Sequence, residues 1–226
     1  MNIQTVSSNE MVGSEMTRPE VIRKVLLVCG PVSSLLYIVA NDIIAAMRYP
    51  GYNRISQPIS QLSATFAPSR PILVPLIVIY FILLLAFGIG VWQSAHGKRA
   101  LRVASSLIIA GVALGFVALV FPMTQLDLSD TMHNILSGTL TPLLMLATIG
   151  FGAAALGKWF RLYSILTIAV FVLGSVLLII QTAQIAAGEP VNWFGITQRM
   201  LTGAWLLWVA VLAAALLRAQ PEQTGI

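Results

Sequence analysis

Cysteine, histidine and charged residues are scarce in this sequence of 226 residues. The single cysteine, Cys29, excludes a disulfide within the chain, and two histidines leave no cluster for a metal site. The sequence also has no HExxH, CxxC, P-loop, dinucleotide fingerprint or GxSxG motif, which sets aside the enzyme classes built on them. We therefore expect no metal and no cofactor, although Asp130 and His133 could together supply two ligands.

The chain is poor in charged residues and consists mostly of long apolar segments. Charged residues make up 9% of the chain and hydrophobic residues 58%, whereas soluble domains are about a quarter charged. Six runs each have about the 20 residues that a helix needs to cross ~30 Å of hydrocarbon. They occupy residues 25–47, 72–92, 101–121, 132–156, 162–185 and 197–217. The sequence predicts an all-α fold, a membrane bundle of six transmembrane helices over residues 23–218, with flexible cytoplasmic tails at 1–22 and 219–226.

The net charge of +5 indicates topology rather than a nucleic-acid partner. Basic residues lie before the first run and after the second, fourth and sixth runs. They are Arg18, Arg23 and Lys24 before the first, Lys98, Arg99 and Arg102 after the second, Lys158 and Arg161 after the fourth, and Arg218 after the sixth. The alternate loops carry Asp127, Asp130 and Glu189. Because cytoplasmic loops are enriched in lysine and arginine, this pattern predicts a multi-pass protein of the cell (plasma or inner) membrane with both termini in the cytoplasm.

Residues 48–71 form the longest loop, and the same pattern predicts that they lie outside. The loop carries three arginines that topology does not explain: Arg48, Arg54 and Arg70. They either reach lipid phosphates or serve a chemical purpose. Ser56 could cap a short helix with Pro58 in its first turn, which would put Ile55, Ile59 and Leu62 on one face. We expect this short interfacial helix to fold over the mouth of the bundle.

Polar side chains within the runs gather toward the predicted outer half of the membrane. Residues three and four apart share a helix face. The set is Ser34, Tyr37, Asn41 and Asp42 in the first run, Asp130, His133, Asn134, Ser137 and Thr141 at the fourth, Gln181 and Gln184 in the fifth, and Gln198, Arg199 and Thr202 in the sixth. Polar groups at membrane depth face one another or a wet cavity, so we expect one outward-opening pocket.

Each member of this set also has a purely structural interpretation. Asp130 could cap its helix, and the glutamines could hydrogen-bond between helices. Arg199, at the outer start of the sixth run, needs an anion or a carbonyl, and Asp42, Asp130 or a ligand phosphate could supply it. The pocket hypothesis expects Asp130, His133 and Arg199 to share one depth and one cavity.

Several short motifs carry a family resemblance. They are ISQL at residues 59–62, FPM at 121–123, HN at 133–134, GITQR at 195–199 and GAWLLW at 203–208. In order and spacing over residues 23–218 they resemble the prokaryotic six-helix membrane family known as domain of unknown function 998, which is grouped with Frag1/DRAM/Sfk1-like proteins. The resemblance implies the fold and a membrane location. Family members typically carry acids where Gln61, Thr124 and Gln198 stand here, which weakens any inference of acid–base or metal chemistry.

Two classes of function fit these residues. The first, which we favour because acids are sparse, is binding of a membrane lipid headgroup or small amphiphile. Its ligand-binding residues would be Asn41, Asp42, Arg54, Ser60, Asp130, His133, Gln181, Gln184 and Arg199, with the two arginines clamping an anionic group.

The second class is an intramembrane lipid hydrolase or transferase. His133 would act as the base, Asp130 or Asp42 would orient it, and Ser60 or Ser56 would be the nucleophile.

Overall fold

The computed structural model of the chain describes residues 17–124 and 130–219. The predicted tails at 1–16 and 220–226, and Asp127, lie outside the described residues. The described part contains six helices long and apolar enough to cross a membrane. They are α1 (Arg18–Ile38) continued by η1 (Val39–Ala45); α2 (Arg70–Gln93); α3 (Arg99–Val120); α4 (Thr131–His133), η3 (Asn134–Leu140) and α5 (Thr141–Ala155); α6 (Lys158–Ala186); and α7 (Phe194–Arg218). The prediction of an all-helical, six-span membrane bundle is confirmed, and its first helix begins at Arg18, ahead of the expected boundary at residue 23.

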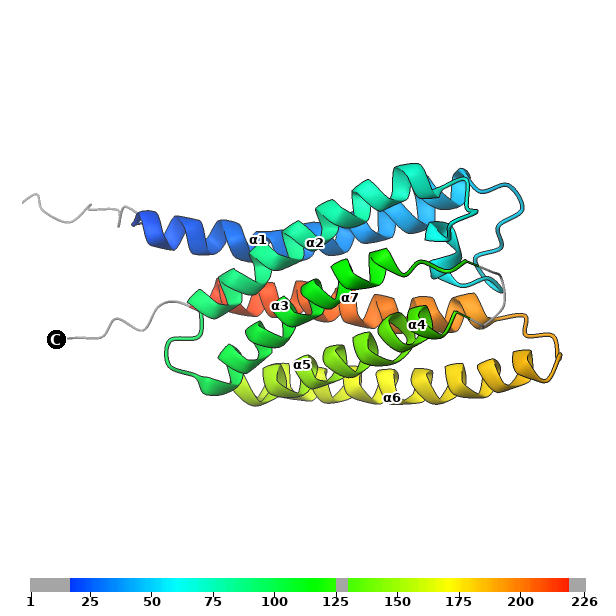
Figure 1. The fold of residues 1–226 in the computed structure, drawn as a ribbon. Coiled ribbons are helices and arrows are strands. Elements are labelled where there is room, and N and C mark those ends of the chain that lie inside the picture. Colours follow the sequence, from blue (N-terminus) through cyan, green and yellow to red (C-terminus); the bar gives the residue numbers. More distant parts are fainter. Residues whose placement is uncertain (1–16, 125–129, 220–226) are drawn as a thin grey trace, which may run out of the picture.

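The contacts between the six spans form a closed ring, and Figure 1 shows the bundle from the side. α1 packs on α2, α2 on α3, α3 on α5, α5 on α6 and α6 on α7, and α7 closes the ring against α1. α7 also touches α2 and α5, and it is the most buried span. The start of α1 and the end of α7 lie at one end of the bundle, here called the terminal end. The long loop, residues 48–69, lies at the opposite end, here called the loop end.

The helices pack closely toward the terminal end of the ring, and the outer surface of the ring is apolar. Trp208 of α7 is fully buried, and its indole N–H donates to the Ser164 hydroxyl of α6 at 3.0 Å. A side chain at Gly152 of α5 would collide with the Trp208 ring at 2.5 Å, so glycine allows α5 to approach. Large apolar side chains such as Leu173 and Ile179 of α6 stay exposed, as expected where lipid is the solvent.

Two spans widen from α-helix into π-helix near the loop end. In η1, the Asn41 side-chain amide donates to the Tyr37 carbonyl at 2.9 Å and so competes for an acceptor of the helix. η3 is followed by Pro142, which has no N–H and whose ring crowds the carbonyl four residues earlier. Such turns inside α-helices are frequent at functional sites, and both occur at the same end of the ring.

The long loop does not form the expected helix capped by Ser56. It contains one short 3₁₀-helix, η2 (Ile59–Ser63), which Pro58 precedes. Ile59 and Leu62 are buried, whereas Ile55 is 55% exposed. The apolar residues therefore do not share one covered face, and a position of this segment at the membrane interface stays a prediction.

We expect the loop end to face outward and the terminal end to face the cytoplasm. In a protein with Cys29 replaced by alanine, a cysteine at exposed Thr65 should react with a membrane-impermeant maleimide in intact cells. A cysteine at exposed Lys98 should react only after the membrane is permeabilised. Labelling in the reverse order would invert the topology.

Candidate functional site

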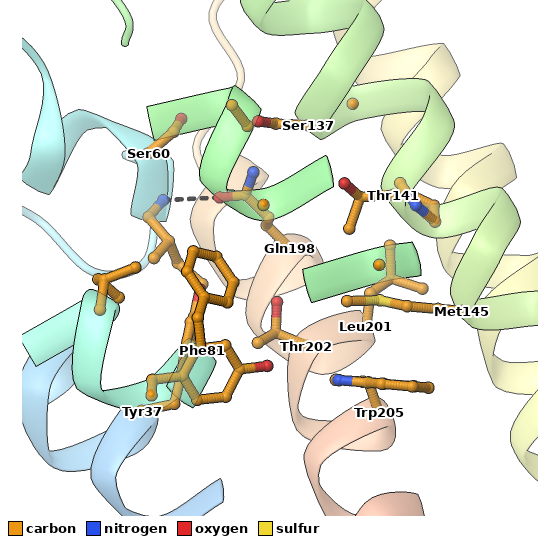
Figure 2. A pocket seen from close by; sticks show the side chains of 18 of the residues that line it. Tyr37, Ser60, Phe81, Ser137, Thr141, Met145, Gln198, Leu201, Thr202 and Trp205 are labelled. Carbon is orange, nitrogen blue, oxygen red and sulfur yellow. Dashed lines mark hydrogen bonds between the residues drawn. The ribbon is translucent and has the colours of Figure 1, made fainter. Parts of the chain in front are cut away.

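A cavity of about 290 Å³ lies inside the ring. It is lined by side chains from all six spans and from the long loop (Figure 2). Its volume is close to the lower limit of known small-molecule sites, which run from about 300 to 1,000 Å³. The cavity is therefore large enough for a small ligand or for part of a larger one.

The cavity is polar toward the loop end and apolar further in. Its polar side chains are Tyr37, Asn41, Ser60, Ser63, Arg70, Tyr80, His133, Ser137, Thr141, Thr148, Gln198 and Thr202, together with the indole N–H of Trp205. Most of these lie near the loop end of their spans or in the long loop, whereas Tyr80, Thr148 and Trp205 lie near the middle of the bundle. Along α7, Gln198 is followed by Leu201 and Trp205, the last about 10 Å deeper at 1.5 Å per residue. Figure 2 shows the same order, with Ser60, Ser137 and Gln198 together and Trp205 at the far side.

The 3₁₀-helix of the long loop is held at the cavity by α7. The backbone N–H of Ile59 donates to Gln198 Oε1 at 2.6 Å, the contact drawn in Figure 2. Two residues earlier on α7, the Ile196 N–H donates to the Ile55 carbonyl at 3.0 Å. These bonds join the ISQL motif to the GITQR motif and bring Ser60 over the cavity.

Arg199 is the centre of a second contact between the loop and the helices. Its Nε donates to Asp42 Oδ1 at 2.7 Å, and its Nη2 donates to the Tyr52 hydroxyl at 3.0 Å. Its Nη1 donates to the Arg54 carbonyl at 2.8 Å and reaches the Gln57 carbonyl at 3.5 Å. We call this network the Arg199 anchor. It ties η1, the long loop and α7 together.

Tyr52 and Arg54 extend the anchor. Burial raises the pKa of Tyr52, so the phenol keeps its proton and donates it to the Pro58 carbonyl at 3.0 Å. Arg54 Nη2 donates to the backbone carbonyl of Asp42 at 2.5 Å. The two arginines expected to clamp a ligand thus bind backbone and carboxylate groups of the protein.

The structure divides the predicted ligand-binding residues into separate groups. Asn41, Ser60 and His133 line the cavity. Asp42, Arg54 and Arg199 belong to the anchor, outside the described cavity lining. Asp130 accepts hydrogen bonds from the Thr124 N–H at 2.6 Å and the Thr124 hydroxyl at 2.5 Å. Arg199 and His133 therefore do not share the cavity.

The two glutamines of α6 also lie outside the described cavity lining. Gln181 is 1% exposed, and its amide donates to the Thr197 hydroxyl at 3.1 Å, which links α6 to α7. Gln184 is half-buried near the end of α6, where its carbonyl accepts from the Ala187 N–H.

His133 lines the cavity with a defined proton arrangement. Its Nδ1 lies 3.1 Å from the Phe121 carbonyl oxygen, which can only accept, so Nδ1 carries the hydrogen. In the neutral ring, Nε2 is then the acceptor. The described residues place no carboxylate within hydrogen-bonding distance of this ring, so the acid–histidine relay that a hydrolase would use is not assembled among them.

Arg70 and Ser63 line the cavity although neither was expected there. Arg70 is the first residue of α2, and its Nη1 donates to the Ser63 carbonyl. Leu73 and Ile77, three and seven residues later, also line the cavity, so helical spacing places all three on one face. That spacing is visible in the sequence and would have identified Arg70.

Fold and cavity together define an integral membrane protein with six spans around a central cavity. The family model "Protein of unknown function (DUF998)" matches residues 31–215, and the chain belongs to this family. The match leaves open the wider grouping with Frag1/DRAM/Sfk1-like proteins. No curated protein and no solved structure matches the chain.

Proposed function

We propose that the protein binds a membrane lipid or another small amphiphile in its central cavity, with the polar head at the loop end. The observation that carries this proposal is the division of the cavity lining. Most hydroxyl and amide groups lie at the loop end. Ile108, Met145, Phe171 and Leu201 surround the deeper part, where Tyr80, Thr148 and Trp205 each add a single polar group. An amphiphile has the same division, and its two ends would each meet a matching environment.

The two π-helical segments, η1 and η3, support a binding role for the cavity. η1 contributes Asn41 to the lining, and η3 contributes Ser137 and Gly138. Irregular backbone at membrane depth is tolerated where it is buried in protein or lines a cavity. Both widened turns meet this condition at the same cavity.

Binding is favoured over lipid hydrolysis because of what surrounds His133. A general base of this kind is normally oriented by a carboxylate, whereas His133 Nδ1 is paired with the Phe121 carbonyl. Asp42 is paired with Arg199 at 2.7 Å, and Asp130 accepts from Thr124. Ser60, which with Ser56 was a candidate nucleophile for the hydrolase alternative, contributes a hydroxyl to the polar end of the cavity.

Filling the cavity should abolish lipid binding. Gly111 lines the cavity, and a Cβ there would meet nothing within 4 Å. The first atom of a new side chain is therefore accommodated there, and the ring of Gly111→Phe should occupy ligand space and remove co-purifying lipid from the native mass spectrum. Gly203 on α7 is exposed and equally open around its Cβ, so Gly203→Phe is the matched control and should keep the lipid.

Equal lipid occupancy in wild type and Gly111→Phe would contradict the proposal. So would a wild-type protein that carries no lipid and, after delipidation, takes up none from a membrane extract.

A further inference from the structure

We propose that the ligand carries an anionic head, and that Arg70 is the residue that recognises it. This inference rests on the proposed function, since it names the chemical class of the ligand in the same cavity. It replaces the expectation that Arg54 and Arg199 form the clamp, because both lie outside the described cavity lining whereas Arg70 is part of it.

The described cavity lining is positive. Arg70 is its one formally charged side chain, and it contains no carboxylate. The described acids are placed elsewhere: Glu20 is paired with Lys24 at 2.9 Å, Asp42 with Arg199 at 2.7 Å, and Asp130 accepts from Thr124. Glu189 follows α6 and is exposed. A cationic head would therefore meet like charge and no counter-charge in the cavity.

Arg70 keeps donors available to a ligand. A guanidinium has five N–H groups, and Nη1 of Arg70 donates to the Ser63 carbonyl. Its Nε and Nη2 have no hydrogen-bond partner among the described residues, and the side chain is half-buried beside Leu73 and Ile77. Arg199, by contrast, uses Nε, Nη1 and Nη2 on protein acceptors. An arginine near hydrocarbon is stabilised by an anion, and its fork suits a pair of anionic oxygens.

Other polar groups of the cavity lining offer further donors at the loop end. Gln198 accepts the Ile59 N–H through Oε1, which leaves its amide NH₂ for the cavity. Ser60 and Ser137 contribute hydroxyls at the same end, as Figure 2 shows. Hydrogen bonds from charged donors to anionic oxygens are about twice as strong as neutral ones, so Arg70 should dominate the selectivity. The ligand class is a single-chain or small anionic amphiphile, with a carboxylate or phosphate head.

Probes with ten-carbon chains and different heads test this inference. Delipidated protein in a non-ionic detergent is titrated by calorimetry with decanoate, decyl phosphate, decanol and decyltrimethylammonium. Wild type should bind at least one of the two anions more tightly than decanol, by about tenfold or more, and should bind the cation most weakly. Preference between decanoate and decyl phosphate then identifies a fatty carboxylate or a phosphate head as the natural chemistry.

Arg70→Gln should weaken anion binding by about 10- to 100-fold and leave decanol binding unchanged. Unchanged decanol binding also shows that the cavity survives the loss of the Ser63 contact. Arg70→Lys, which keeps the charge and loses the fork, should recover part of the anion affinity. Arg48→Gln, at an exposed arginine at the start of the long loop and outside the described cavity lining, is the matched control and should bind as wild type does.

Different failures have different meanings. If decanol binds as tightly as the anions, or if Arg70→Gln keeps the preference for anions, the inference is overturned while the proposed function stands. If wild type binds none of the probes and no extracted lipid, the proposed function fails and this inference fails with it.

Discussion

Gly195→Ala should detach the long loop from α7. A Cβ at Gly195 would lie 2.5 Å from the Arg54 carbonyl oxygen and closer still to the Gln57 carbonyl oxygen. Both are backbone atoms, so no side-chain rotation can relieve the contact. The Arg199 anchor uses the same two carbonyls, and the added methyl therefore competes directly with it. We expect a loss of about 2–3 kcal/mol in stability, because overpacking and the lost loop contacts act together.

Limited trypsin digestion and thermal unfolding in detergent check this prediction. Gly195→Ala should be cleaved quickly at Arg54, which the anchor protects in wild type, and should unfold at a lower temperature. Its ligand affinity should also fall, because Ser60 and Ser63 would leave the cavity. Gly203→Ala on the same helix has open space around its Cβ and should match wild type or exceed it slightly. Equal protease resistance of the two variants would show that the loop is not held at Gly195.

The spans and the polar faces were predictable because both depend on local sequence. A helix crossing hydrocarbon needs a continuous apolar run, and hydropathy alone reports it. The spacing of His133, Ser137 and Thr141 in span four placed all three on one face, and all three line the cavity. Asp130 and Asn134 were assigned to the same face and are absent from the described lining.

The sequence limited the possible partners of Arg199 to a few anions but could not identify which of them binds it. Asp42, Asp130 and a ligand phosphate were all possible partners for Arg199. The structure selects Asp42, 157 residues away in the chain, because α1 and α7 close the ring side by side. No local pattern encodes that closure. The anchoring role of Arg199 follows from it, since the long loop then passes directly over the guanidinium.

The π-helical turns also limit what periodicity can predict. A π-turn takes more residues than an α-turn, so a face calculated for an α-helix drifts after it. Ser34 shows a second limit, because it precedes η1 and shares the predicted face of Tyr37 and Asn41, yet it donates to the Leu206 carbonyl of α7 at 2.9 Å instead of lining the cavity. Arg70 was missed for a different reason. It was assigned to the loop, whereas α2 begins with it.

Arg199 should be the residue whose loss costs the fold most at the loop end. Arg199→Ala leaves Asp42 without its ion pair and removes the donors to Tyr52 and the loop carbonyls. Removing one partner of a buried pair costs about 3–5 kcal/mol. Because the Arg199 and Asp42 side chains are 16% and 30% exposed, we expect about 2–4 kcal/mol. Thermal unfolding of the purified protein measures the loss.

Two further variants separate anchoring from simple charge pairing. Lysine keeps the charge at position 199, but its ammonium cannot reach Asp42, Tyr52 and the Arg54 carbonyl together, so Arg199→Lys should recover only part of the stability. Exchanging the charges in Asp42→Arg/Arg199→Asp should not restore it, because an aspartate repels the loop carbonyls. Arg161→Lys at the exposed terminal end is the control and should unfold as wild type does. Wild-type stability in Arg199→Lys would mean that charge alone matters there, and the anchor would lose its role in holding the long loop over the cavity.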